Sequence, residues 1–218
     1  MITLYHCMSA RSFRPLWTLE ELQLSYALKM LPFPPRVFAK HYLEINPLGT
    51  VPCFFDGATK MTESAAICQY LVTRYGPTPL AVTVDETDYG AFLNALYFGE
   101  ATLTFPQTIV LRYTRLEPVE RRVPQVAEDY EKWFRGRLRG VDAIVSSHPY
   151  ICADRFTAAD ISVGYALMLA KSLSLDGHFS GAVKKYWERL ERRDGFKRAV
   201  AAQERAAREQ GLAEASSL

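Results

Sequence analysis

The chain has 218 residues, of which 49% are hydrophobic, so it is long enough to bury the core of one large domain or two small ones. Its 26 Lys and Arg residues nearly balance its 24 Asp and Glu residues, and the two signs are interspersed along the sequence. We therefore expect neither nucleic acid nor an anionic membrane as a partner. The arginines between Arg112 and Arg139 are interrupted by acidic residues and carry no recognition motif, which predicts a solvated helix face.

Targeting signals, disulfides and metal ligands are not indicated. The first nine residues alternate like a strand and lack the basic start and apolar run of a signal peptide, and no apolar stretch is long enough to cross a bilayer. The four cysteines show no paired spacing, which favours single buried thiols and a reducing cytoplasm. The four histidines are scattered and have no cysteine at ligand spacing, so we expect no metal site.

The hydrophobic period changes repeatedly over the first 76 residues. Residues 2–6 alternate as a strand, residues 11–23 are apolar at helical spacing, and residues 25–31 form a second strand candidate before a proline-rich connection. Residues 51–55 and 58–61 predict a hairpin with Asp56-Gly57 as its two-residue turn. A helix is expected from Glu63, with Gly76 as its stop. Its buried face should hold Ala65, Ile67, Cys68, Leu71 and Val72. The order β-α-β-α-β-β-α predicts a small mixed sheet, parallel at its start, with helices packed on it.

The rest of the chain has a helical pattern throughout. A linker over residues 78–86 separates a domain of residues 1–77 from an all-helical domain of residues 87–218. Helices are expected at about 87–115, 120–147, 157–172 and 181–210, the last with a break near Asp194 and Gly195. Thr157 and Asp160 match a capping box, with Phe156 placed to pack onto Ile161. The apolar character of that helix predicts a central position in the helical half.

Pro52 stands where the third strand should begin, although proline cannot donate a hydrogen bond to a sheet. A bend there would leave the backbone N–H and C=O groups of Val51 free to pair with an extended peptide. Glu63 and Ser64 follow the hairpin at the start of a helix, where free N–H groups and the helix dipole favour a carboxylate. The combination predicts a small peptide ligand with a free acidic end. The alternative that Glu63 and Ser64 only start the helix stays open.

Three segments resemble the glutathione S-transferase family. Residues 46–57 and 60–71, "NPLGTVPCFFDG" and "KMTESAAICQYL", are similar to its glutathione-binding segment. Residues 4–22, "LYHCMSARSFRPLWTLEEL", resemble its first strand and helix, and residues 154–170, "DRFTAADISVGYALMLA", its capping box and core helix. The resemblance implies an α/β thioredoxin-like N-terminal domain followed by an all-α C-terminal domain. It also implies a cytoplasmic homodimer with a role in detoxification.

The resemblance extends to the ligand contacts. It implies a cis bond between Val51 and Pro52, and backbone pairing of Val51 with the cysteinyl unit of glutathione. Glu63 and Ser64 would then hold the amine and carboxylate of the γ-glutamyl unit.

One position of this binding segment departs from the family pattern. Thr50 stands where many members of the family have a lysine, which removes one charged contact to the peptide. Lys40 and His41, just upstream, are candidates to replace that contact, although a solvated helix face accounts for both equally simply.

The family activates the thiol with a hydroxyl or a cysteine between the first strand and the first helix. Arg14 resembles a family arginine, and the hydroxyl of serine-using members lies four or five residues before it. Ala10 has no hydroxyl, so Ser9 is our first candidate. Ser12 is the second, with helix capping as its alternative role. Tyr5 and Cys7 also lie here, but Tyr5 is within the strand and expected to pack in the core, and Cys7 has no partner for redox chemistry.

These residues predict a glutathione transferase that activates glutathione, as co-substrate, for attack on a small hydrophobic electrophile. Residues on the first helix of the helical domain are candidates for the electrophile pocket: Tyr97, Phe98, Thr102 and Tyr113. An isomerase or dehalogenase would use the same thiolate, and a non-catalytic adaptor or stress protein would use the same fold. A glutathione-dependent thiol oxidoreductase is disfavoured, because it needs a cysteine where Ser9 stands.

Overall fold

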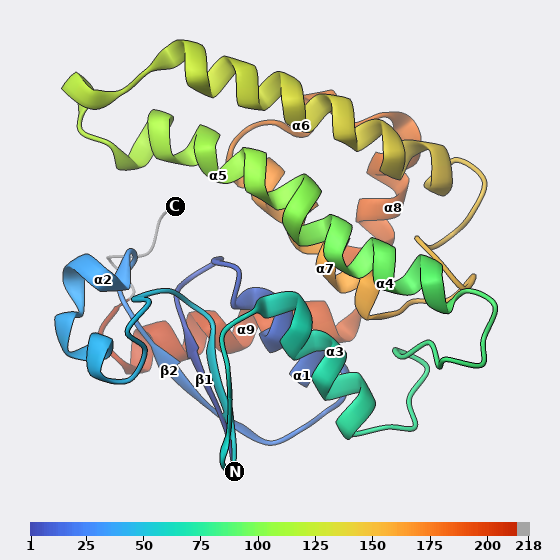
Figure 1. The fold of residues 1–218 in the computed structure, drawn as a ribbon, viewed down its shortest axis with the longest axis horizontal. Helices are drawn as coiled ribbons and strands as arrows, with labels where there is room; N and C mark the ends of the chain where they lie inside the picture. The colour runs from blue at the N-terminus through green and yellow to red at the C-terminus, as the bar shows by residue number, and fades with distance from the viewer. Residues whose placement is uncertain (213–218) are drawn as a thin grey trace. The chain divides into compact units, whose positions relative to one another are not determined.

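The computed structural model describes residues 1–212, which divide into two compact units. The first unit contains residues 1–81 together with residues 191–212, and the second contains Val82–Leu190. The first is a mixed sheet with helices, and the second is helical (Figure 1). The expected boundaries at residues 77 and 87 fall on either side of the observed change of unit after Ala81.

The predicted order of strands and helices in the first 76 residues is confirmed. The strands are β1 (Ile2–His6), β2 (Tyr26–Met30), β3 (Cys53–Asp56) and β4 (Thr59–Met61). The helices are α1 (Phe13–Glu21), α2 (Pro35–Phe38) and α3 (Ser64–Arg74), and α2 is followed by a 3-10 turn, η1 (Lys40–Glu44). The predicted second helix is therefore a short α-helix that begins at the second of two consecutive prolines and is followed by a 3-10 turn.

The four strands lie in the order β2-β1-β3-β4. Strands β1 and β2 are parallel, as predicted, whereas β3 runs antiparallel to both β1 and β4. Asp56 pairs with Thr59, so the turn of the hairpin is Gly57-Ala58 and the prediction of Asp56-Gly57 was wrong by one residue. Gly57 has a φ of 57°, which glycine adopts without strain. The Asp56 carboxylate accepts hydrogen bonds from the hydroxyls of Tyr70 and Tyr75, at 2.9 and 2.8 Å, which holds Asp56 in the strand.

Helix α9 (Asp194–Glu209) packs against α1 in the first unit. The Phe196 ring lies edge-on to the buried Trp17 ring, with centroids 4.9 Å apart. A Cβ on Gly195 would lie 2.4 Å from Cδ of Glu21, so a larger residue there would have to displace the Glu21 side chain. Chain order alone had assigned this helix to the domain of residues 87–218, and its packing places it with the first unit instead.

The second unit begins with a long helix, residues 89–116, that contains two π-helical segments. Its parts are α4 (Tyr89–Tyr97), η2 (Phe98–Thr104), α5 (Phe105–Leu111) and η3 (Arg112–Leu116). They are followed by a 3-10 turn η4 (Val119–Arg121), α6 (Pro124–Val145), α7 (Ala158–Ser172), a 3-10 turn η5 (Asp176–His178) and α8 (Gly181–Glu191). The expected long helices and the break before residue 194 are confirmed.

Helix α7 is buried along nearly its whole length, and its predicted capping box is present. The Thr157 N–H donates to the Asp160 carboxylate at 2.8 Å, and the Ala159 N–H donates to the Thr157 hydroxyl at 3.3 Å. Burial raises the pKa of Asp160 to about 6. Phe156 is buried, with its ring centroid 6.1 Å from that of Tyr150, and its packing onto Ile161 stays a prediction.

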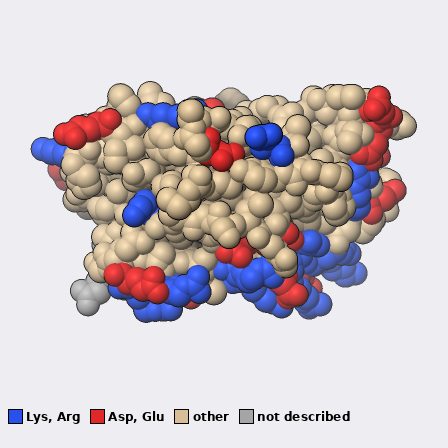
Figure 2. Space-filling model, turned by 90° about the horizontal axis from the view of Figure 1, so that it is seen from below, with Lys and Arg blue, Asp and Glu red and all other residues tan. Residues whose placement is uncertain are grey.

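The surface and the cysteines follow the sequence pattern. Acidic and basic side chains lie beside one another along the edge of the face in Figure 2. The arginines expected on a solvated surface are exposed: Arg112, Arg115, Arg121, Arg122, Arg135, Arg137 and Arg139. All four cysteines are buried free thiols. Within residues 1–212, none of the helices combines the length and the apolar character needed to cross a bilayer.

Candidate active site

The strand register brings three of the predicted site segments to one end of the sheet. Tyr5 near the end of β1 pairs with Cys53 at the start of β3, and Met61 at the end of β4 pairs with Phe54. Because β3 is antiparallel to both neighbours, the chain leaves β1 and β4 at the end where it enters β3. The turn after β1, which carries Ser9, the Val51–Pro52 segment before β3 and the start of α3 therefore share this end.

The segment before β3 is held by contacts within its own loop. The Thr50 carbonyl accepts hydrogen bonds from the Tyr42 hydroxyl and from Nδ2 of Asn46, both at 2.8 Å. Gly49 has a φ of 59°, and a Cβ there would lie 2.7 Å from Cβ of Arg36. The backbone that leads into Val51 is thus fixed before any ligand binds.

The backbone of Val51 lies just before β3 and is not part of the sheet. The Val51–Pro52 peptide bond is cis, and β3 starts only at Cys53. Among residues 1–212, the backbone N–H and C=O of Val51 form no hydrogen bond with another backbone group. They are the groups that an added extended strand would use.

Ser64 and Glu63 lie at the N-terminus of α3, as expected, but in different environments. Glu63 is exposed, occupies the N-cap position and makes no side-chain capping bond. Ser64 is buried, and its hydroxyl accepts a hydrogen bond from Nη1 of Arg14 at 3.2 Å. Arg14 is itself fully buried in α1. A buried guanidinium therefore lies at the helix N-terminus, which adds positive charge to a position that already favours anions.

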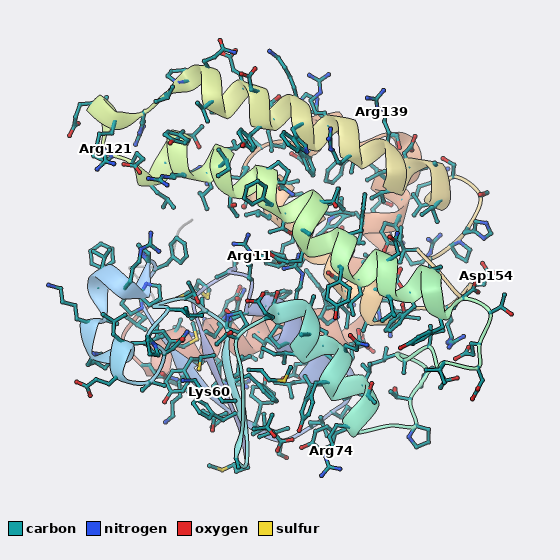
Figure 3. All side chains as sticks on the ribbon, in the orientation of Figure 1. Arg11, Lys60, Arg74, Arg121, Arg139 and Asp154 are labelled. Carbon is teal, nitrogen blue, oxygen red and sulfur yellow. The ribbon has the colours of Figure 1, made fainter. Side chains whose placement is uncertain are left out.

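Ser9 lies in the turn between β1 and α1. It is half-buried and has a φ of 51°, in the left-handed region that favours glycine. Its backbone N–H donates to the side-chain oxygen of Gln203 at 3.1 Å. The cation of Arg11, half-buried two residues further on, lies in the same turn (Figure 3).

Ser12 is oriented differently from Ser9. It is fully buried, and its hydroxyl lies 2.7 Å from Nδ1 of His6, a ring with no exposed surface. Burial lowers the pKa of His6 to about 4. Ser12 occupies the N-cap position of α1, which was its alternative role, but its side chain makes no capping hydrogen bond. The hydroxyl instead binds His6 in the interior.

The side chains of Tyr5 and Cys7 pack against other residues of the first unit. The Tyr5 ring packs against those of Tyr42 and Phe55, with centroids 5.4 and 6.2 Å away. Cys7 is fully buried, its thiol donates weakly to the Pro32 carbonyl at 3.7 Å, and burial raises its pKa to about 12. A thiol with this pKa is protonated at neutral pH and a poor nucleophile.

Thr50, Lys40 and His41 are exposed. Within the described chain, no hydrogen bond joins the side chains of Lys40 or His41 to Thr50. Lys60 of β4, labelled in Figure 3, donates to the Ile45 carbonyl and lies 5.8 Å from the centroid of the Phe55 ring. Lys60 thereby connects the hairpin to the loop that precedes it.

Sequence reasoning missed several polar residues that surround the site: His6, Tyr42, Asn46 and Gln203. His6 had a visible signal, because it is a polar residue at a buried position of an alternating strand. Gln203 had a weaker one, because it lies on the face of α9 that also carries Ala199, Ala202 and Ala206. The contact between these two residues depends on the packing of α9.

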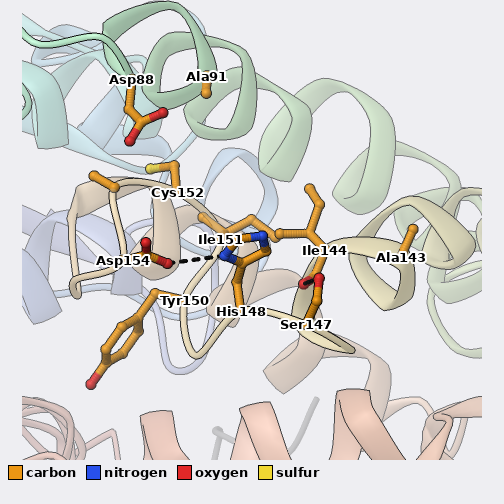
Figure 4. Close-up of a pocket in the computed structure, with 11 residues that line it drawn as sticks. Asp88, Ala91, Ala143, Ile144, Ser147, His148, Tyr150, Ile151, Cys152 and Asp154 are labelled. Carbon is orange, nitrogen blue, oxygen red and sulfur yellow. Dashed lines mark hydrogen bonds and ion pairs between the residues drawn. The ribbon is translucent and has the colours of Figure 1, made fainter.

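The second unit contains a separate cavity of about 430 Å³ (Figure 4). Asp88, His148, Cys152 and Asp154 line it, and Nδ1 of His148 lies 3.0 Å from Oδ1 of Asp154. Burial raises the pKa of Cys152 to about 11, so its thiol is protonated at neutral pH. None of the predicted site residues lines this cavity.

The expected electrophile-pocket residues are exposed or half-buried along the long first helix of the second unit. Among residues 1–212, no three His, Cys, Asp or Glu side chains are grouped so that they could hold a metal ion.

Comparisons with known proteins agree with this arrangement. Residues 8–74 match the family model described as glutathione S-transferase, N-terminal domain. Glutathione S-transferase 3 of Schizosaccharomyces pombe is 27% identical over 181 residues, covering 78% of this chain and 75% of that protein. Glutathione S-transferase hmp2 of Hypomyces subiculosus is 32% identical over 156 residues, covering 67% and 70%. A stringent starvation protein A homolog of Pasteurella multocida is 24% identical over 164 residues, covering 74% and 73%.

Solved structures share the fold. A glutathione transferase from Methylococcus capsulatus superposes with a TM-score of 0.83 at 22% identity, covering 93% of this chain and 98% of that chain. Ure2p5 from Phanerochaete chrysosporium, cocrystallized with 1-(S-glutathionyl)-2,4-dinitrobenzene, superposes with a TM-score of 0.80 at 21% identity, covering 95% and 96%. Together with the family-model match and the 32% identity to hmp2, these likenesses show that the chain belongs to the glutathione S-transferase family.

Proposed function

We propose that this protein is a glutathione transferase that binds glutathione along its first unit and activates the thiol for attack on a small hydrophobic electrophile. One observation carries the proposal. The strand register brings three features to the same end of the sheet: the turn with the Ser9 hydroxyl, the Val51 backbone outside β3, and the helix N-terminus at Ser64 with its buried arginine.

Each part of glutathione has a counterpart at this end. The cysteinyl unit pairs with the backbone of Val51 next to Pro52, as an added strand would. The γ-glutamyl carboxylate binds at Ser64 and the first N–H groups of α3, and its amine pairs with Glu63. Thr50 and Lys40 supply outer contacts to the peptide. Ure2p5, which shares the fold, was cocrystallized with a glutathione conjugate, and this supports the same class of ligand here.

Ser9 carries the chemistry in this proposal. A free thiol has a pKa of about 8.5, and each unit by which the site lowers it corresponds to about 1.4 kcal/mol in favour of the thiolate. The Ser9 hydroxyl donates to the sulfur, assisted by the N-terminus of α1 and the charge of Arg11. The thiol proton passes to solvent. The sulfur then forms a bond to the electrophilic carbon, and the leaving group departs with the electron pair of the bond that breaks.

The proposal also covers the electrophile, the oligomeric state and the cellular location. Tyr97, Phe98, Thr102 and Tyr113 are the candidate residues for binding the electrophile, and the protein acts as a homodimer in the cytoplasm in detoxification. The reducing cytoplasm suits four free thiols. Isomerisation or dehalogenation would use the same thiolate with a different pocket.

A second candidate is a non-catalytic adaptor or stress protein. The likeness to a stringent starvation protein A homolog favours it, as does the threonine at position 50. In that case the site end of the sheet would serve folding or partner binding and would not support turnover.

Retention on immobilised glutathione, combined with turnover of an activated aryl chloride, tests the proposal. We expect the parent to be retained and active. Ser9→Ala should be retained, but its turnover should be at least tenfold slower. The folded fraction of Ser12→Ala should keep the pH dependence of turnover that the parent shows. A parent that is retained without turnover would favour the adaptor, and full activity in Ser9→Ala would remove Ser9 from the mechanism. Sedimentation of the parent tests the dimer.

A further inference from the structure

Gln203 of α9 contacts the turn that carries Ser9. Its side-chain oxygen accepts from the Ser9 N–H at 3.1 Å and lies 3.0 Å from Nε2 of His6. Gln203 is 4% exposed and His6 is fully buried, so the contact between Gln203 and the ring is shielded from water. Ser9 and Gln203 are separated by 194 residues, so the contact exists only when α9 is packed in the first unit.

The donors and acceptors in this group follow from what each atom can do. A backbone N–H can only donate, so the Gln203 atom that faces Ser9 must be its carbonyl oxygen. That oxygen can only accept, so Nε2 of His6 carries the proton. Burial lowers the pKa of His6 to about 4, which keeps the ring neutral near pH 7. Nδ1 is therefore an acceptor, and the Ser12 hydroxyl donates to it at 2.7 Å.

The backbone of Ser9 needs such support. A φ of 51° costs an L-residue about 1–2 kcal/mol relative to the usual regions, so the surroundings must hold it. One anchor is local, because the Ala10 N–H donates to the Cys7 carbonyl at 3.1 Å. A second anchor is Gln203, on a helix that Arg198 connects to Glu20 of α1. The direction of the Ser9 side chain depends on both.

We propose that Gln203 is a positioning residue for Ser9. By binding the Ser9 backbone N–H, it keeps the hydroxyl directed at the sulfur of bound glutathione. Its effect on the chemistry passes through the Ser9 backbone and needs no contact with the substrate. The catalytic part of this inference rests on the proposed function. The effect on the Ser9 backbone does not.

The matched variants are Gln203→Met and Gln210→Met. Methionine has a similar length but provides no strong acceptor for the Ser9 N–H. Gln210 lies at the end of the same helix and also binds backbone, accepting from the Met30 N–H at 2.9 Å and donating to the Leu28 carbonyl at 3.0 Å. Gln210 is exposed, so Gln210→Met removes two bonds between the end of α9 and β2 without touching the turn at Ser9.

Two measurements decide the inference. The first is hydrogen exchange of the Ser9 amide by NMR, which needs no ligand. We expect exchange in Gln203→Met to be at least tenfold faster than in the parent and unchanged in Gln210→Met. The second is the pKa of the bound glutathione thiol, from the thiolate absorbance. We expect it to rise by about one unit in Gln203→Met, so that about tenfold less thiolate forms at a pH below both pKa values.

The kinetic expectation separates positioning from loss of fold. At neutral pH, kcat of Gln203→Met should fall about tenfold with the KM for glutathione within twofold, and kcat should recover toward the parent value at high pH. If Ser9 exchange in Gln203→Met equals that of the parent, the inference is overturned. The same holds if the parent is active and the pKa of the bound thiol is unchanged in Gln203→Met. A parent that binds no glutathione would overturn the proposed function and the catalytic role of Gln203 with it, and the exchange measurement would still decide whether Gln203 holds the Ser9 backbone.

Discussion

Arg14 of α1 and Ser64 of α3 are 50 residues apart in sequence, and Nη1 of Arg14 donates to the Ser64 hydroxyl at 3.2 Å. Both side chains are buried. The hydroxyl that we expect to bind the carboxylate of glutathione is thus oriented by a cation that lies behind it in the protein. An anion bound at the start of α3 would interact with the helix dipole and with this guanidinium.

Ser64→Ala should weaken both the fold and ligand binding. It deprives a buried guanidinium of one acceptor, which costs about 1–3 kcal/mol in the free energy of unfolding. It also removes a contact to the proposed carboxylate. Urea denaturation and equilibrium binding of glutathione measure the two effects. Stability equal to that of the parent would show that the Arg14 contact contributes little.

Glu63→Gln should separate binding from stability. Glu63 is exposed and makes no capping bond, so the urea midpoint should stay within about 0.5 kcal/mol of the parent. Glutathione binding should weaken severalfold, because the amine loses a charged partner. Calorimetric titration checks this, and unchanged affinity would exclude Glu63 from the site.

His6 should make stability depend on pH in a defined window. Burial lowers its pKa from 6.5 to about 4, so between these values the unfolded chain binds a proton that the native protein does not. The stabilising contribution is complete above pH 6.5 and is lost as pH falls toward 4, with an upper limit of about 3 kcal/mol. Urea midpoints from pH 7 to 4 should fall less steeply in His6→Gln than in the parent. Parallel curves would contradict this.

The cysteines should be unreactive in the native state. Burial raises the pKa of Cys7 to about 12 and that of Cys68 to about 11, and Cys53 is shifted in the same direction. An aromatic disulfide reagent at pH 7 should react slowly with the folded protein. In denaturant it should react with all four thiols. One fast-reacting thiol in the folded protein would revive the thiol oxidoreductase reading.

Gly99 and Gly90 offer a matched test of packing in the second unit. A Cβ on Gly99 would lie 2.4 Å from Oγ of Ser162 and 2.6 Å from its backbone carbon, whereas one on Gly90 would meet nothing within 4 Å. Gly99→Ala should destabilise the protein by about 1–3 kcal/mol through overpacking. Gly90→Ala should be neutral or stabilise it by up to about 1 kcal/mol. Denaturant midpoints measure both, and equal values would argue against close packing of η2 on α7.

Features set by neighbouring residues could be predicted from the sequence, and features set by distant packing could not. The alternation at residues 2–6 and the Thr157–Asp160 capping box depend on a few adjacent positions, and both are confirmed. The hairpin turn was misplaced because Tyr70 and Tyr75, well beyond the hairpin, bind Asp56. In the candidate site, the sequence pointed to the segments around Ser9, Val51 and Ser64. It gave no partner for Ser64 or Ser9, because these are Arg14 and Gln203, 50 and 194 residues away.

The return of α9 to α1 has a consequence for synthesis on the ribosome. The Phe196 ring covers Trp17, and Gln203 meets Ser9, so the first unit cannot be completed until nearly the whole chain has emerged. The helices of Val82–Leu190 are made while the earlier sheet still lacks one of its covering helices. A nascent chain halted before residue 191 would expose the apolar surface of α1 and leave the Ser9 turn unanchored, and it would be a natural target for chaperones.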